Sequence, residues 1–237
     1  IAADPYEGRE VVLVADEIIK SDGNFNLPRN LIVAKDGSLY LADTGNHRIV
    51  HITISGNILE TWGRFADGST LDGGAPGGTF YEPWSIAIGT DGSVFVADTW
   101  NHRIQKFTSD GKFLMQWGTF GQGESGAAFW GPRDIAIDSR GWVYVADTGN
   151  KRIVVFDEGG NFITEFGSAG LLAGQFDEPV GVAVDENGHV YVADTWNQRV
   201  QVFEIDEQSN SFYPINEWEI VGWYGQSLDN KPYIEVG

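Results

Sequence analysis

The sequence predicts an all-β protein built from repeated four-stranded sheets, and three observations lead to that prediction. The pattern Ala-Asp-Thr, Gly or Trp, Asn, a variable residue, Arg, and Ile or Val occurs four times. Its aspartates recur at intervals of 55, 49 and 47 residues, at Asp43, Asp98, Asp147 and Asp194. A fixed period of this size is typical of stacked or ring-like repeat folds. Each copy is flanked by short segments that alternate apolar and polar residues between glycine-rich turns, which is the pattern of β-strands.

Each repeat contains four such strands in succession. In the third copy, residues 134–138 and 142–146 are the first two strands, and residues 152–156 and 162–166 are the last two. Four consecutive strands with tight turns make an antiparallel meander, and repetition of the meander around an axis gives a β-propeller without helices. We expect one domain over residues 1–237, with full blades at about 30–63, 85–118, 134–167 and 181–223.

The order of motifs resembles the NHL repeat. The carrying residues are Val-Tyr-Val-Ala-Asp-Thr-Gly-Asn-Lys-Arg-Ile at 143–153 and the Gly-x-Phe-x-x-Pro approach at 174–179, and the resemblance covers roughly residues 24–205. It implies a propeller, but it implies no single activity. Similar repeats serve RNA-binding domains, peptide-amidating lyases, sensor domains and interaction scaffolds.

The two ends of the chain read as partial blades. Residues 9–18 resemble the outermost strand of a preceding blade, and residues 231–237 resemble the innermost strand of a following one. Three alternatives follow: the chain is a fragment of a longer protein, the ends meet in a reduced fifth blade, or another copy completes the open ends. The last alternative gives a ring or a filament by strand addition.

The amino-acid composition limits the classes of partner that the protein can bind. The net charge is −19, from 34 acidic and 15 basic residues, and this disfavours binding to a phosphate backbone. No apolar run is long enough to span a membrane, and the absence of cysteine excludes disulfides and thiolate sites. We therefore expect a protein partner or further copies of the chain, and no nucleic acid. The acidic, aromatic-rich, cysteine-free composition favours an extracellular or cell-envelope location.

The repeated polar residues are interpreted as structural. An Asp after a strand caps its turn, and an Arg five residues later can bind that Asp. His47 and His102 are replaced by Lys151 and Gln198 at the same repeat position, so a shared catalytic or metal-binding role is disfavoured. We expect no catalytic residue, no metal site and no cofactor. Loop carboxylates of Asp67, Asp72 and Asp177 leave calcium as the one candidate ion.

Candidate binding residues are those that differ between blades. Arg29, Trp84 and Arg133 follow the blade-opening prolines, where the first strands approach the channel, and this predicts a pocket for an anionic or planar ligand. The turns between the second and third strands share one face of the propeller with the connections between blades. Trp100, Trp130 and Trp196 are predicted on this face as anchors of a protein–protein contact. The expected function is a non-catalytic recognition or scaffold propeller, including self-assembly through terminal strands. The alternative is a lyase or lactonase with a divalent cation in the channel.

Overall fold

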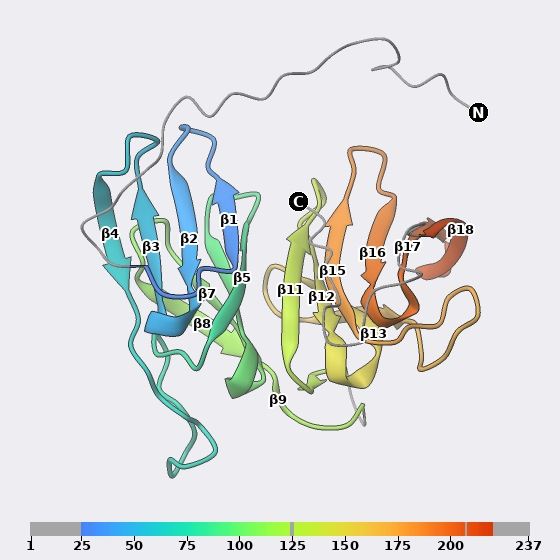
Figure 1. The fold of residues 1–237 in the computed structure, drawn as a ribbon, viewed down its shortest axis with the longest axis horizontal. Coiled ribbons are helices and arrows are strands. Elements are labelled where there is room, and N and C mark those ends of the chain that lie inside the picture. The colour runs from blue at the N-terminus through green and yellow to red at the C-terminus, as the bar shows by residue number, and fades with distance from the viewer. Residues whose placement is uncertain (1–24, 124–125, 207, 220–237) are drawn as a thin grey trace, which may run out of the picture.

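The computed structural model describes residues 25–123, 126–206 and 208–219, which form four antiparallel four-stranded sheets with strand order 1-2-3-4 in each (Figure 1). The prediction of a propeller with four-stranded blades is confirmed. Blade 1 contains β1 (Asn30–Val33), β2 (Leu39–Asp43), β3 (Arg48–Ile52) and β4 (Ile58–Trp62). Blade 2 contains β5 (Pro83–Ile88), β6 (Val94–Asp98), β7 (Arg103–Phe107) and β8 (Phe113–Trp117).

The second half of the chain repeats this arrangement. Blade 3 contains β11 (Pro132–Ile137), β12 (Trp142–Asp147), β13 (Arg152–Asp157) and β14 (Phe162–Phe166). Blade 4 contains β15 (Pro179–Val184), β16 (Val190–Asp194), β17 (Arg199–Asp206) and β18 (Ser211–Glu219). Between blades 2 and 3, β9 (Thr119–Phe120) pairs in parallel with β10 (Ala128–Phe129). The terminal strands expected at 9–18 and 231–237 lie outside the described residues.

The turn after each repeated Asp is a single turn of 3-10 helix, which the strand pattern did not predict. These turns are η1 (Thr44–Asn46), η2 (Thr99–Asn101), η3 (Thr148–Asn150) and η4 (Thr195–Asn197). Each ends at a residue in the left-handed region, with φ of 54° to 57°, at His47, His102, Lys151 and Gln198. Residues other than Gly are uncommon in this region. At all four positions the backbone N–H donates to the carbonyl of the Thr that begins the turn. No helix long and apolar enough to cross a bilayer occurs in the described part of the chain.

The first strand of each blade faces the centre. Residues of β1, β5, β11 and β15 line one central cavity of about 240 Å³, and most of them are aliphatic. The blades pack against one another through buried aromatic clusters, and each cluster contains the Phe of one interblade connection: Phe80, Phe129 and Phe176. All three are fully buried, as expected for repeat core residues.

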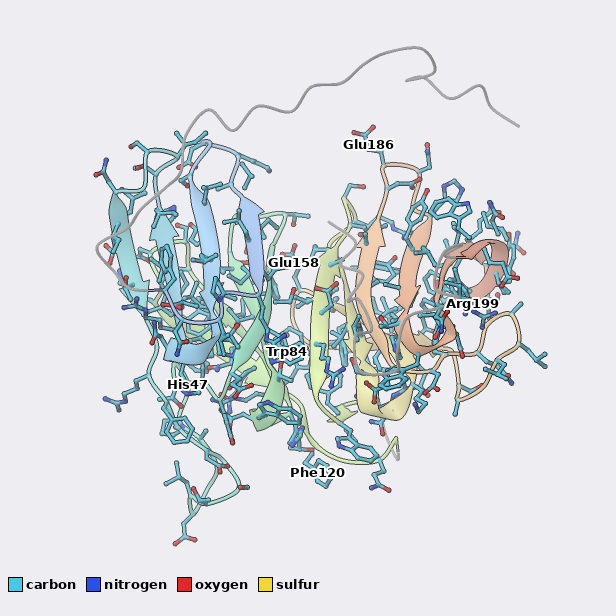
Figure 2. All side chains as sticks on the ribbon, viewed as in Figure 1. His47, Trp84, Phe120, Glu158, Glu186 and Arg199 are labelled. Carbon is cyan, nitrogen blue, oxygen red and sulfur yellow. The ribbon has the colours of Figure 1, made fainter. Side chains whose placement is uncertain are left out.

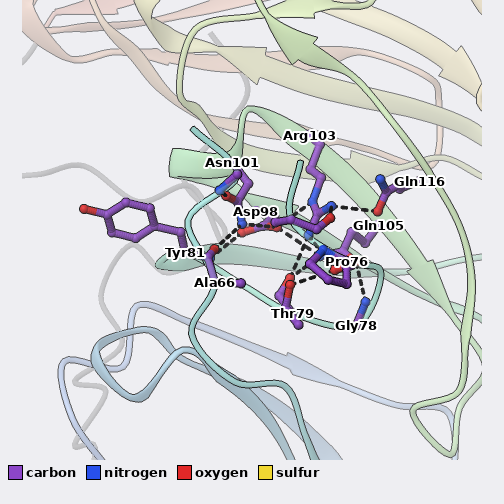
Figure 3. A network of polar contacts seen from close by, with 12 residues as sticks. Ala66, Pro76, Gly78, Thr79, Tyr81, Asp98, Asn101, Arg103, Gln105 and Gln116 are labelled. Carbon is purple, nitrogen blue, oxygen red and sulfur yellow. Dashed lines mark hydrogen bonds and ion pairs between the residues drawn. The ribbon is translucent and has the colours of Figure 1, made fainter. Parts of the chain in front are cut away.

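A buried carboxylate holds each connection to the blade that follows it. Asp98 accepts hydrogen bonds from the Tyr81 backbone N (2.7 Å), Asn101 Nδ2 (2.9 Å) and Arg103 Nε (2.7 Å), as Figure 3 shows. The equivalent Asp43, Asp147 and Asp194 are also fully buried and receive three equivalent donors, from the preceding segment, the turn and the third strand. Burial raises the pKa of Asp98 to about 6 despite the nearby Arg103. The repeated Asp and Arg are therefore structural residues that hold each blade to the segment before it.

A threonine hydroxyl joins each blade to the next one. Thr44, Thr99 and Thr148 donate from Oγ1 to the carbonyl of the next blade-opening proline at 2.6, 2.8 and 2.6 Å. Within the described residues, Thr195 Oγ1 reaches only the Ala193 carbonyl of its own blade, at 3.5 Å. The fourth blade therefore has the same hydroxyl group, but no proline carbonyl of a following blade accepts from it within the described residues.

We expect Thr99→Val to lower the free energy of unfolding by about 1–3 kcal/mol, because it leaves the buried Pro132 carbonyl without its donor. The matched change Thr195→Val should cost less than about 0.5 kcal/mol. Urea unfolding of both variants measures the difference. An equal loss at both positions would contradict this expectation and would reveal an interblade acceptor for Thr195 outside the described residues.

Candidate functional site

The 3-10 turns and the interblade connections lie at one end of the propeller, here called the loop face. It comprises the four turns given above and residues 63–82, 118–123, 126–131 and 167–178. Figure 2 places His47 and Phe120 at this end and Glu186 at the opposite end. Because the connections bridge blades that are otherwise alike, this is where the blades differ most in sequence and length.

The structure brings three of the predicted residues together at the start of the inner strands. The guanidinium carbon Cζ of Arg29 lies 3.8 Å from the ring centroid of Trp84, and that of Arg133 lies 4.7 Å from it. Arg29 directly precedes β1, while Trp84 and Arg133 are the second residues of β5 and β11. This group is called the Arg–Trp stack. Two cations over one indole gain cation–π attraction, but they also bring two like charges together.

The Arg–Trp stack carries hydrogen-bond donors without described acceptors. Arg29 Nε and Trp84 Nε1 are both buried and have no hydrogen-bond partner among the described residues. Arg133 Nη1 pairs with Glu178 Oε2 at 3.1 Å, whereas no ion pair of Arg29 occurs among the described residues. The stack is thus locally cationic in an acidic protein.

The other three predicted residues lie elsewhere on the loop face. Trp100, Trp130 and Trp196 are 37%, 42% and 47% exposed. The indole Nε1 of Trp100 donates to Glu82 Oε2 at 3.0 Å, and the ring of Trp130 makes an edge contact with Phe120. Trp100 and Trp196 are part of 3-10 turns and Trp130 is in a connection, whereas the Arg–Trp stack is formed at the inner strands.

Sequence reasoning missed two exposed phenylalanines on the loop face. Phe65 and Phe120 are 55% and 59% exposed. Their rings pack on His47 and His102 at centroid distances of 4.9 and 4.8 Å. Both follow the Trp-Gly that ends a blade by two residues, so their shared position was the signal that could have identified them.

His47 and His102 act as acceptors that join neighbouring blades. The backbone N of Glu82 donates to His47 Nδ1, and that of Gly131 donates to His102 Nδ1, each at 3.0 Å. A backbone N–H is always the donor, so each ring is neutral and carries its proton on Nε2. Burial lowers the pKa of both histidines. Lys151 at the same repeat position pairs instead with the carboxylate of Asp177.

The remaining histidines lie apart from these two. His51 stacks on Tyr40 with a centroid distance of 4.1 Å, and its Nε2 is 2.7 Å from Ser38 Oγ. His189 Nδ1 is 2.9 Å from Asp185 Oδ2 in the β15–β16 turn. In the described part of the chain, no three His, Asp or Glu side chains lie close enough to hold one metal ion.

Comparisons with known proteins identify the repeat. Three segments match the NHL repeat, at residues 80–107, 129–156 and 176–203, which confirms the resemblance seen in the sequence. The chain is similar to peptidyl-glycine alpha-amidating monooxygenase of Mus musculus, with 36% identity over 120 residues. That match covers 46% of this chain and 12% of the mouse protein. It is also similar to the protein brain tumor of Drosophila melanogaster, with 44% identity over 45 residues, or 19% of this chain and 4% of the fly protein.

Solved structures share the fold at low identity. A catalytically inactive virginiamycin B lyase from Staphylococcus aureus superposes with a TM-score of 0.59 and 19% identity, covering 82% of this chain and 56% of the lyase. The structure of U3-55K gives a TM-score of 0.59 at 15% identity, covering 79% of this chain and 51% of that one. The chain thus spans little more than half of either structure.

We expect stability to fall as the pH drops below about 6.5, the ordinary histidine pKa, because His47 and His102 are held neutral in the folded protein. The folded-state pKa of both histidines is lowered. The stability that they contribute is therefore complete above the pKa of the unfolded state and is lost as the pH falls through the pKa of the folded state. Asp98 acts in the opposite direction but is unchanged in the variants.

The measurement is the urea midpoint at pH 7.5 and pH 5.5 for the wild type and the double variant His47→Gln/His102→Gln. Glutamine already occupies this repeat position as Gln198. The double variant should lose less stability between the two pH values, and an unchanged difference would show that these histidines do not contribute to it.

Proposed function

The chain is an NHL-repeat β-propeller, and on that basis we propose that it is a non-catalytic recognition module whose working surface is the loop face. The Arg–Trp stack is the observation that carries this proposal. It binds an anionic group of the ligand, such as a carboxylate of a protein partner. The three exposed tryptophans surround the partner contact on the same face, since Trp and Arg are enriched among residues that dominate binding energy.

Two buried donors that no described residue satisfies support an anionic ligand. A buried donor without an acceptor costs about 1–3 kcal/mol, and a bound oxygen atom at Arg29 Nε or Trp84 Nε1 recovers that cost. Hydrogen bonds to charged groups are stronger than neutral ones, which favours an ionised acceptor. The net charge of −19 repels most anions from the rest of the surface, so the attraction is local to the stack.

The proposal also covers the location of the protein and its self-assembly. The acidic, cysteine-free composition supports a secreted or cell-surface protein. Self-assembly through the terminal strands is a specific version of the scaffold role, and light scattering of the 237-residue chain tests it. Defined rings or polymers support this version, while a uniform monomer contradicts it and leaves the anion site to be tested separately.

An enzymatic role is the alternative, and the similarity to an amidating monooxygenase and to a virginiamycin B lyase favours it. Such a lyase or lactonase would use a divalent cation in the central channel. A bound ion with three or more protein ligands on the axis would support that alternative. The engagement of His47 and His102 with the backbone of neighbouring connections favours the recognition role instead.

The test of the anion site uses the Trp84 indole N–H as a reporter in NMR titrations with inorganic phosphate and with acetate. The Trp84→Phe spectrum assigns the signal. We expect a saturable shift of this signal in the wild type and its loss in Arg29→Gln. The matched control is Arg64→Gln, which removes the same charge from an exposed loop-face position. No shift with either anion, or equal shifts in both arginine variants, would contradict the proposal.

A further inference from the structure

A second site lies on the loop face beside blade 2. It is a cleft of about 280 Å³ between the connection that precedes β5 and the one that follows β8. Trp100, His102 and Phe120 form its aromatic part, and the backbone of Gly73 and Gly74 contributes to the facing wall. Neither arginine of the Arg–Trp stack lines it, so this cleft is distinct from the anion site, while Trp100 belongs both to the cleft and to the partner contact proposed above.

Two side chains that line this cleft, His102 and Gln116, present hydrogen-bond donors. His102 Nδ1 already accepts from Gly131, so the neutral ring presents Nε2–H. Gln116 Oε1 accepts from Arg103 Nη1 at 2.8 Å, so the free end of this side chain is its NH2 group. The Trp100 indole N–H is engaged by Glu82. The cleft therefore combines aromatic faces with two donors that no described residue engages.

Gln116 differs from the residues at the same register position in the other three blades, of which blade 1 has Thr61. At the same register position, blades 3 and 4 carry Glu165 and Glu217, which bind Arg152 and Arg199 at 2.6 and 3.0 Å. A glutamate there would present only acceptor oxygens. Replacement by Gln116 preserves the bond to the arginine, removes a negative charge and adds a donor at the cleft (Figure 3). Gln116 lines the same cleft as Trp100, His102 and Phe120.

We infer that this cleft binds a proline-rich segment of a partner protein in the polyproline II conformation. Proline rings stack on aromatic side chains, and aromatic-lined grooves are the usual receptors for this conformation. Proline has a carbonyl acceptor and no N–H donor, so a run of prolines matches donors such as His102 Nε2–H and the Gln116 NH2 group. Asp67 is near enough to His102 to affect its pKa, and it favours a basic residue beside the prolines.

The experiment measures fluorescence anisotropy with a fluorescein-labelled decaproline peptide that ends in an arginine amide. A glycine–serine peptide of the same length with the same terminal arginine is the control probe. The variants are Phe120→Ala and Gln116→Glu, the latter copying the residue of blades 3 and 4. Phe65→Ala is the matched control, because Phe65 has the same exposure and packs on His47 in the same way.

We expect saturable binding of the proline peptide alone, weakened at least about fivefold by Phe120→Ala and by Gln116→Glu. Phe65→Ala and Arg29→Gln should leave the affinity within about twofold, because both lie outside the cleft. Arg29→Gln also separates this result from the anion site, whose failure does not affect this outcome. Circular dichroism melting curves confirm that each variant is folded.

Three results would overturn the inference. The first is equal affinity for the proline and glycine–serine peptides, which would leave only attraction of the arginine to an acidic surface. The second is an equal loss in Phe120→Ala and Phe65→Ala. The third is saturable binding of cellohexaose that Phe120→Ala abolishes while the proline peptide does not bind, which would assign the cleft to a carbohydrate.

Discussion

The burial of one aspartate per blade is the constraint on which the rest of the structure depends. Each carboxylate is removed from water and must be surrounded by donors, and these come from the turn, the third strand and the preceding connection. The paired arginine then binds carbonyl groups of that same connection, as Arg103 does with Ala75 and Thr79. Breaking a buried ion pair of this kind typically costs about 3–5 kcal/mol. Connections of different length and sequence are thereby held in the same position relative to the blade that follows each of them.

Much of the fold could be predicted because the local patterns agree with one another. The alternation around Asp147, the glycine turns and the repeat period all indicate the same four-stranded unit. Repetition also indicated that Asp98 and Arg103 are structural, since a residue present in every blade serves the blade. The proximity of Arg29, Trp84 and Arg133 followed from their equivalent positions after the blade-opening prolines, which the structure places around a common centre.

The rest of the candidate site depends on tertiary contacts that one sequence does not reveal. Phe65 and Phe120 lie in connections of unequal length, and their packing on histidines requires the course of the folded chain. The interchange of His47, His102, Lys151 and Gln198 indicated a structural role, but not the hydrogen bond that fixes the histidine tautomer. The sequence alone did not indicate the position of Gln116 at the cleft, because its equivalence to Glu165 and Glu217 depends on the register of the paired strands.

The left-handed residue after each 3-10 turn also distinguishes the third joint between blades from the first two. The first two joints place a histidine acceptor against a backbone N–H, whereas the third places the Lys151 ammonium against a carboxylate. If the third blade docked in place of the first, its ammonium group would meet the Glu82 N–H, donor against donor. Such a mismatch disfavours wrong neighbours without changing the shared core. Chains of similar repeated units are prone to misassembly during folding. The different contact at the third joint therefore favours the correct neighbours.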